Sequence, residues 1–347
     1  MRGDCKAMSD DRKLSGPPAG AYKCPRKTSS IAAERGRMTQ KQVVRGDGTP
    51  SRRDQVLAHW RRVMKREPDL VSPRTFSEKL LVRLTGPSDP IYPLIGYKHL
   101  VPSFVRQAVG DRVRIPKRYL VTPALEPGDF DLLPDRFVLK SSYASGLNLI
   151  VEDKAALDWD ETCQHFNSQI GTKLNARRQR GEWNCIIAEE HLGDGGPQSP
   201  DDLKFFCFHG SDGSFDYFMQ INTGRFEDHK HSFFGSDGVR LPFKASGTDR
   251  HETDPKLPAN LSDAVEIAYD LSRGFDHIRV DLYSVRGEIW FGELTPFHVG
   301  AKCSFDDPGA DAWIGDKWEQ RFPWFNGYDL DRDAPRPPLG ALGARYE

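Results

Sequence analysis

The stretch Ile-Arg-Val-Asp-Leu-Tyr at residues 278–283 alternates strictly between apolar and other side chains. This period of two predicts a β-strand with one face in a core. The opposite face then carries Arg279, Asp281 and Tyr283 together. After a short turn, Glu-Ile-Trp-Phe-Gly-Glu-Leu-Thr at residues 288–295 predicts a returning strand. We therefore expect an antiparallel hairpin with a charged face.

Two carboxylates on this hairpin, Asp281 and Glu293, are 12 residues apart in the sequence. A hairpin can bring them side by side, where they repel each other unless a cation lies between them. Mg²⁺ prefers such oxygen ligands, often two carboxylates together with substrate phosphates. Arg279 would add a fixed positive charge for a developing oxyanion. The alternative is an amphipathic hairpin with surface charges, and the imperfect alternation of the second strand does not place Glu293.

A lysine followed by a loop of small residues forms a second pattern. Residues 136–140 are a short apolar strand that ends in Lys140, and residues 147–151 are its partner. The loop between them, Ser141–Gly146, leaves backbone N–H groups accessible to an anion, and Lys140 adds a point charge. The alternative is an ordinary hairpin whose lysine extends along its surface.

Three further segments complete the pattern. Residues 183–192 predict a buried strand that ends in Glu189 and Glu190. Residues 201–210 predict a strand with Asp202 and Lys204 on one face. A helix is predicted from Ser262, as its cap, to Gly274, with an apolar stripe along one side.

The segment before these strands is predicted to be helical. Apolar spacing favours helices over residues 55–64 and 75–84, and Thr75 with Glu78 fits a capping box at the start of the second. A third helical stretch, residues 93–109, carries Lys98. Residues 115–121 read as extended chain.

Charge is distributed unevenly along the chain. Lys plus Arg number 49 and Asp plus Glu 50, a balance that is not typical of a nucleic-acid binder. Residues 1–54, however, carry thirteen basic and six acidic side chains, so a segment of +7 precedes a body of −8. This segment has few apolar residues, and we expect it to be disordered. It is either a basic arm for an anionic partner or an extension without a role, and Met8 or Met38 could be the true start.

Several other features of the sequence indicate the cellular compartment of the protein and whether it binds zinc. The chain has no run of 18 apolar residues, and its first twelve residues lack the apolar region of an export signal. Its six cysteines include no Cys-x-x-Cys pair, which is typical of reduced thiols in the cytoplasm. His229 and His231 lack nearby further ligands and favour a polar strand or loop over a zinc site.

Taken in order, these motifs resemble those of the ATP-grasp superfamily and, within it, the teichuronopeptide-biosynthesis (TupA-like) branch, over about residues 76–318. The resemblance implies an α+β ATP-grasp fold, in which two α+β lobes hold ATP behind an N-terminal pre-grasp region. The implied parts are a disordered basic extension (1–54), the helical pre-grasp region (55–134), a small lobe with a phosphate flap (135–192), a large lobe with the metal site (193–325) and a Pro/Gly-rich tail (326–347).

The resemblance also implies roles for single residues. The implied catalytic residues are Arg279, Lys140 and Lys204. The implied ATP-binding residues are Lys98, Lys140, Ser145, Gly146, Glu189, Glu190, Leu192, Asp202, Lys204 and Arg225. The implied Mg²⁺ ligands are Asp281 and Glu293. The sequence departs from the usual motifs at Thr295, where many such ligases have Asn, at Tyr97, which replaces an Asp before the lysine, and at Tyr143 in the flap.

The activity that the resemblance implies is ATP-dependent carboxylate–amine ligation through an acyl phosphate, with ATP and Mg²⁺ as cofactors. The expected partners are a carboxylate-bearing small molecule or polymer precursor and an amine such as an amino acid, in the synthesis of a cell-surface polymer. We expect neither nucleic-acid binding nor stable membrane insertion. The alternatives are a kinase of the same fold that acts on a sugar hydroxyl, and a non-catalytic nucleotide- or glycan-binding module. The substrates and the oligomeric state stay open.

Overall fold

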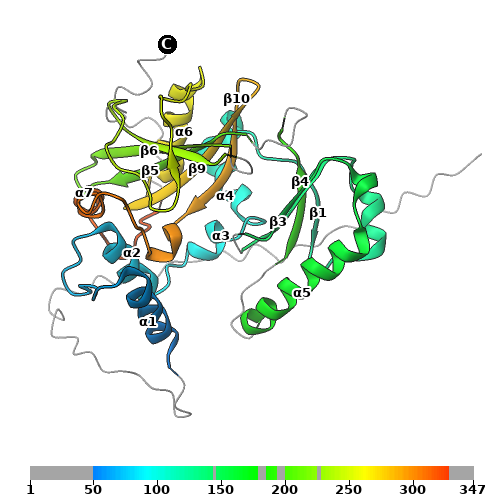
Figure 1. Cartoon of the computed structure of the whole chain (residues 1–347), viewed down its shortest axis with the longest axis horizontal. Helices are drawn as coiled ribbons and strands as arrows, with labels where there is room; N and C mark the ends of the chain where they lie inside the picture. The colour runs from blue at the N-terminus through cyan, green and yellow to red at the C-terminus, as the bar shows by residue number, and fades with distance from the viewer. Residues whose placement is uncertain (1–49, 144–145, 179–184, 194–199, 225–227, 328–347) are drawn as a thin grey trace, which may run out of the picture. The chain divides into compact units, whose positions relative to one another are not determined.

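The computed structural model describes residues 50–143, 146–178, 185–193, 200–224 and 228–327, which form a mixed α+β structure with two β-sheets (Figure 1). The predicted basic extension therefore lies almost entirely outside the described residues, as does most of the predicted C-terminal tail. No helix in the described part of the chain combines the length and apolarity that crossing a bilayer requires.

The first sheet has four antiparallel strands in the order β1-β4-β2-β3. Its strands are β1 (Arg118–Thr122), β2 (Phe137–Ser141), β3 (Asn148–Val151) and β4 (Ile186–Glu190). The hairpin predicted around Lys140 is confirmed as β2–β3. β1 comes from the segment assigned to the pre-grasp region and pairs with β4. Helix α5 (Trp159–Arg178), which the sequence patterns above do not predict, packs against this sheet through Phe166 and Ile170.

The second sheet has six strands in the order β10-β9-β5-β6-β7-β8. Its strands are β5 (Asp202–His209), β6 (Phe215–Thr223), β7 (Lys230–Gly235), β8 (Asp249–Arg250), β9 (His277–Val285) and β10 (Glu288–Thr295). All neighbours are antiparallel except β7 and β8. Alternating residues of β5 separate two cores: Phe205 packs with α4 (Val101–Val109) and α6 (Leu261–Ser272), and Phe206 packs on the opposite face with the N-terminal helices.

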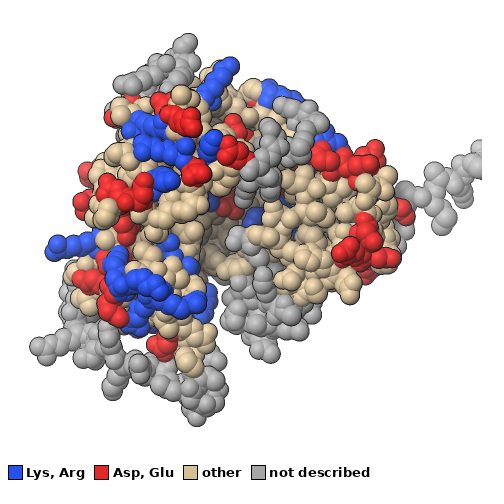
Figure 2. All heavy atoms as spheres, viewed as in Figure 1, with Lys and Arg blue, Asp and Glu red and all other residues tan. Residues whose placement is uncertain are grey.

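The helices on the Phe206 face come from both ends of the described chain. They are α1 (Arg52–Met64), α2 (Phe76–Thr85) and α7 (Ala310–Asp316), and Figure 1 shows α1 and α2 on the opposite side of the sheet from α6. The capping box predicted at Thr75 and Glu78 is present at the start of α2. Figure 2 shows basic side chains gathered in the region of α1. Arg52, Arg53 and Arg62 of this helix are exposed.

The predicted hairpin that carries Arg279 and Asp281 is β9–β10. Its apolar residues Ile278, Val280 and Leu282 are fully buried, as predicted. The register shifts between Phe291 and Glu293, so that Glu293 becomes the Cα partner of Asp281. This β-bulge at Gly292 explains why strict alternation did not place Glu293. An added Cβ at Gly292 would lie 2.9 Å from the Asp281 carbonyl oxygen, so the close approach of the strands requires glycine.

Two helix predictions need correction. The stretch 93–109 is not one helix but two, α3 (Tyr92–Gly96) and α4, because Tyr97 takes an extended conformation between them. Pro102 near the start of α4 begins a new helix rather than continuing the old one. Ser262 does not cap α6, because it lies inside the helix. The helix begins at Leu261, and Asn260 occupies the cap position.

A buried histidine in β7 predicts acid sensitivity of the fold. His231 is 1% exposed, and its Nε2 accepts a hydrogen bond from the Ala245 amide at 3.0 Å. Burial, with the charges of His229 and His251, lowers the pKa of His231 to about 4. The unfolded chain has a histidine pKa of about 6.5. Below that pH the unfolded state binds a proton that the folded state does not. Stability should therefore fall by about 1.4 kcal/mol per pH unit until pH approaches 4.

The measurement is denaturant unfolding of the protein at several pH values between 7 and 4.5. His231→Gln keeps an acceptor for Ala245 but cannot titrate, so its free energy of unfolding should depend less on pH than that of the wild type. His165→Gln, at an exposed position of α5, is the matched control and should keep the wild-type dependence. Parallel curves for wild type and His231→Gln would contradict the prediction.

Candidate functional site

Side chains from both sheets line one cavity of about 820 Å³. Ten of the thirteen predicted site residues line it: Lys98, Lys140, Gly146, Glu189, Glu190, Leu192, Lys204, Arg279, Asp281 and Glu293. Asp202 does not line the cavity but is buried next to Lys204. Ser145 and Arg225 lie outside the described residues. The cavity therefore brings together side chains that are spread over almost 200 positions of the sequence.

Arg279 occupies the centre of the charged group on β9 and β10. Its Nε and Nη2 donate to the two carboxylate oxygens of Asp281 at 2.6 and 2.7 Å, and Nη2 also donates to Glu293 Oε1 at 2.8 Å. The same Nη2 lies 3.1 Å from Thr295 Oγ1, which in turn donates to Glu293 at 2.8 Å. The cation between the two carboxylates is thus the guanidinium of the chain itself, which the sequence argument did not foresee.

Lys204 joins this group from the neighbouring strand. It is the Cα partner of Asp281 across β5 and β9, and its Nζ lies 2.7 Å from Asp281 Oδ2. A second carboxylate, that of Asp202 on the same face of β5, lies 3.2 Å away. Because these side chains are largely buried, the pairs are poorly screened by water.

Lys98 reaches the site from the turn between α3 and α4. Its Nζ lies 3.8 Å from Glu293 Oε2. Burial acts to raise the pKa of Glu293, but the positive charges of Arg279 and Lys98 outweigh it and hold this pKa well below the usual range. Burial likewise opposes the charge of Arg279, yet the neighbouring carboxylates raise its pKa. Glu293 and Arg279 are therefore both ionised at neutral pH.

The four-stranded sheet contributes the opposite wall of the cavity. Lys140 on β2 forms an ion pair with Glu189 on β4. One carboxylate oxygen of Glu190 binds the backbone, since its Oε2 accepts a hydrogen bond from the Lys117 amide at 3.0 Å. Tyr143, at the start of the predicted flap, forms a hydrogen bond of 2.8 Å with Tyr92.

A turn after β10, which sequence reasoning missed, also lines the cavity. It contains three successive residues with positive φ: Val299 at 43°, Gly300 at 57° and Ala301 at 66°. A β-branched residue such as Val299 rarely adopts this conformation, and such strain is frequent at functional sites. The turn is held from behind, because Trp60 of α1 donates from Nε1 to the Ala301 carbonyl at 2.6 Å. Its side chains His298 and Lys302 face the cavity. The available signal was Gly300, which stands two residues from both His298 and Lys302, soon after Glu293.

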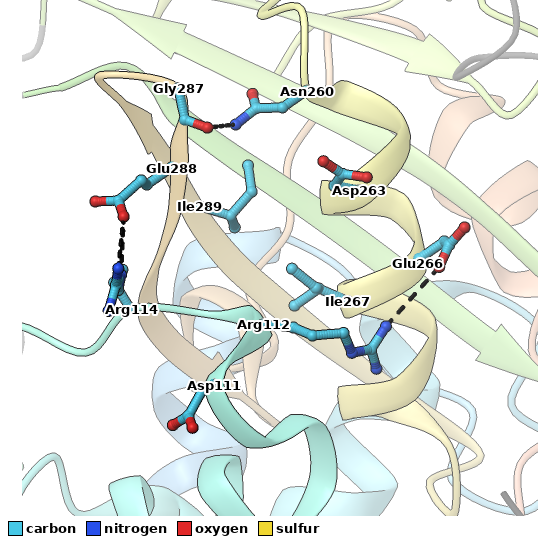
Figure 3. Close-up of a pocket in the computed structure, with 10 residues that line it drawn as sticks. All are labelled: Asp111, Arg112, Arg114, Asn260, Asp263, Glu266, Ile267, Gly287, Glu288 and Ile289. Atoms are coloured by element: carbon cyan, nitrogen blue, oxygen red, sulfur yellow. Dashed lines mark hydrogen bonds and ion pairs between the residues drawn. The ribbon is translucent and has the colours of Figure 1, made fainter.

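A second cavity, of about 530 Å³, lies between α6 and the β9–β10 turn (Figure 3). Its arginines are already paired: Arg114 with Glu288 at 2.8 Å, and Arg112 with Glu266 at 3.8 Å. It contains none of the predicted site residues. The larger cavity is therefore the candidate site.

Comparison with known families identifies the family to which the chain belongs. The model of the TupA-like ATP-grasp family matches residues 78–319, which is more than half of the chain. The chain therefore belongs to the TupA-like ATP-grasp family, and the family resemblance seen in its motifs is confirmed. A search of curated protein sequences found no match.

Several ligases are among the solved structures to which the chain is similar. D-alanine–D-alanine ligase from Bacillus anthracis, complexed with ATP, is 15% identical, with a TM-score of 0.33 over 59% of this chain and 54% of that chain. The same enzyme from Helicobacter pylori is 14% identical, with a TM-score of 0.36 over 65% and 61%. Phosphoribosylamine–glycine ligase from Thermotoga maritima is 16% identical, with a TM-score of 0.38 over 63% and 52%. The chain thus spans little more than half the length of these proteins.

Proposed function

We propose that the protein is an ATP-dependent ligase that joins a carboxylate to an amine through an acyl phosphate and releases ADP and phosphate. The observation that carries this proposal is the convergence of Lys98, Lys204 and Arg279 on Asp281 and Glu293 within one cavity. Membership of the ATP-grasp family supports the same reaction class.

The chemistry explains why such a site is needed. A carboxylate is a poor acyl donor, because its leaving group would be oxide. Transfer of the γ-phosphoryl group of ATP to the carboxylate oxygen gives an acyl phosphate, and an amine then attacks the carbonyl carbon and displaces phosphate. Both reactants of the first step are anions, so the enzyme must neutralise charge and align them.

The described residues suit the phosphates of ATP. We assign Lys98, Lys140 and Lys204 to the phosphates, and each is already held beside a carboxylate, which keeps its ammonium group oriented. We assign Arg279 to stabilisation of the developing oxyanion. By family resemblance, the hinge around Glu189, Glu190 and Leu192 holds adenine and Asp202 holds the ribose. The family resemblance likewise assigns the flap residues Ser145 and Gly146, and Arg225, to the phosphates.

Mg²⁺ fits the donor set at the hairpin. Asp281 and Glu293 are Cα partners on adjacent strands, and both offer the hard oxygen ligands that Mg²⁺ prefers. When bound there, Mg²⁺ would supply further charge neutralisation at the phosphates. Thr295, with its single hydroxyl oxygen, offers a weaker ligand than the Asn of many such ligases.

We further propose, by family resemblance, that the acid is a uronic acid or glutamate carboxylate of a cell-surface polymer precursor, and that the amine is an amino acid. The basic groups of the cavity suit an acidic acceptor. His298, whose Nδ1 lies 2.5 Å from Arg279 Nη1, and Lys302 also line the cavity from the strained turn and add polar groups for such a substrate.

The test is incubation with ATP, Mg²⁺ and a pool of uronic acids, glutamate-containing acids and amino acids. ADP release should require both an acid and an amine, and mass spectrometry should find an amide product. Asp281→Asn should reduce the rate by at least about a hundredfold, since it removes one of two proposed metal ligands.

Two outcomes would contradict the proposal. A stable phosphorylated product without an amide would identify a kinase. ATP binding without turnover in the presence of every pool would identify a nucleotide-binding module. Glu288→Gln, an exposed carboxylate at the other end of β10, is the matched control and should leave turnover unchanged.

A further inference from the structure

Lys98 lies in a turn rather than in a regular element. The turn joins α3, which ends at Gly96, to α4, which begins at Val101. Its side chain nevertheless reaches into the cavity, with Nζ 3.8 Å from Glu293. A long lysine side chain on an unsupported turn would lose much conformational entropy on binding phosphate. Something outside the turn must hold its backbone.

The backbone around Lys98 is held by one residue of the four-stranded sheet and by one residue that directly follows a strand of it. The Lys98 amide donates to the Ser142 carbonyl, the residue after β2, at 2.9 Å. Arg118 on β1 donates through Nη1 to the His99 carbonyl at 2.8 Å and through Nη2 to the Lys98 carbonyl. One guanidinium therefore binds two consecutive peptide groups, and the chain is bound on both sides of Lys98.

The Ser142 side chain adds a third attachment. Its Oγ lies 2.5 Å from His99 Nδ1 and 3.4 Å from the His99 amide. Ser142 is fully buried. Burial, with the nearby charge of Arg118, lowers the pKa of His99, so the imidazole is neutral at pH 7 and can accept the hydroxyl proton in a hydrogen bond.

We infer that Arg118 and Ser142 are positioning residues, which fix the Lys98 backbone to the four-stranded sheet so that the Lys98 ammonium group meets the ATP phosphates. This inference rests on the proposed function. Neither Arg118 nor Ser142 lines the cavity. Both terminal nitrogens of Arg118 donate to backbone carbonyl oxygens, so we do not expect this guanidinium to bind ATP itself. The arrangement also joins Lys98 to β2, which carries Lys140, so both lysines are attached to the same sheet.

An arginine is required at position 118 by the geometry. The planar guanidinium presents its donors in a fixed fork, which matches two adjacent carbonyl oxygens, whereas the ammonium group of a lysine is a single point charge on a flexible stem. Arg118→Lys therefore keeps the charge and loses the fork. We expect this substitution to raise the KM for ATP by about tenfold, with a smaller change in kcat.

The experiment is a double-mutant cycle of Arg118→Lys and Lys98→Met. If Arg118 acts through Lys98, Arg118→Lys should raise the KM for ATP in the wild type but change it less than about twofold in Lys98→Met. Thermal unfolding of each variant separates this effect from loss of fold. Arg114→Lys, which disrupts an exposed arginine–carboxylate pair outside the cavity, is the matched control and should change neither quantity.

Each outcome decides a different question. An equal change in KM in both backgrounds would overturn the inference and leave the proposed function standing. Failure of the wild type to bind ATP, measured by calorimetry, would overturn the proposed function and with it this inference. Should Arg118→Lys not fold, Ser142→Ala takes its place in the same cycle, because it removes the Oγ contacts and leaves the carbonyl contact to the Lys98 amide.

Discussion

Arg279→Met should lower kcat by about 10²–10³-fold, the usual effect of removing one preorganised donor to a developing oxyanion. The substitution also leaves Asp281 and Glu293 facing each other without the guanidinium that now contacts both. The pKa of Glu293 should then rise, since Arg279 is the main charge that lowers it. The acidic limb of the pH–rate profile should move to higher pH. Steady-state ADP release as a function of pH measures both effects.

Two comparisons make this result interpretable. Arg114→Met removes an exposed arginine beside the second cavity and should keep the wild-type rate. Arg279→Lys keeps the charge without the fork and should fall between the wild type and Arg279→Met. A wild-type rate in Arg279→Met would show that this residue has no part in the reaction.

Arg83→Met should destabilise the fold by about 3–5 kcal/mol, because it leaves a carboxylate buried without its partner. Arg83 of α2 and Asp276 form an ion pair whose side chains are 1% and 0% exposed. The guanidinium also donates to the His277 carbonyl at 2.9 Å and lies over the Trp318 ring, 4.4 Å from its centroid. Urea unfolding followed by circular dichroism measures the loss.

The double variant Arg83→Met/Asp276→Asn tests the cause. It removes the buried charge as well as its partner, so it should lose less stability than the two single variants added together. The control is Arg61→Met, which breaks an exposed pair with Glu67 and should cost no more than about 1 kcal/mol. Additive losses, or a loss for Arg83→Met as small as that of the control, would contradict the prediction.

Local pattern was enough to predict most strands of the site. The alternation around Asp281 was visible because apolar residues in β9 face a core at every second position. The lysine at the end of β2 was visible because small residues follow it. The register of Glu293 was not visible, because the bulge at Gly292 depends on the close approach of two backbones rather than on side-chain pattern. The break after α3 was missed for a related reason, since apolar spacing continues across Tyr97 although the helix does not.

Contacts between residues that are distant in the sequence could not be predicted, because no local sequence pattern indicates them. Nothing in the sequence around Arg118 indicates that its guanidinium binds the carbonyls of residues 98 and 99. The central place of Arg279 between two carboxylates was also missed, because the sequence predicted Mg²⁺ as the cation there and gave Arg279 only a role toward a developing oxyanion. Such contacts depend on how α3, α4 and the two sheets pack, which is set by cores assembled from many segments.

The hydrogen bond from Trp60 to Ala301 bears on how much of the chain the proposed activity needs. Trp60 is 1% exposed and belongs to α1, which precedes the matched family region by more than a helical turn. A shortened protein that starts at residue 66 would keep every family motif. It would nevertheless lose the donor that supports the left-handed turn at the cavity wall. The unit that the proposed activity needs should therefore begin at α1, ahead of the region by which the family is recognised.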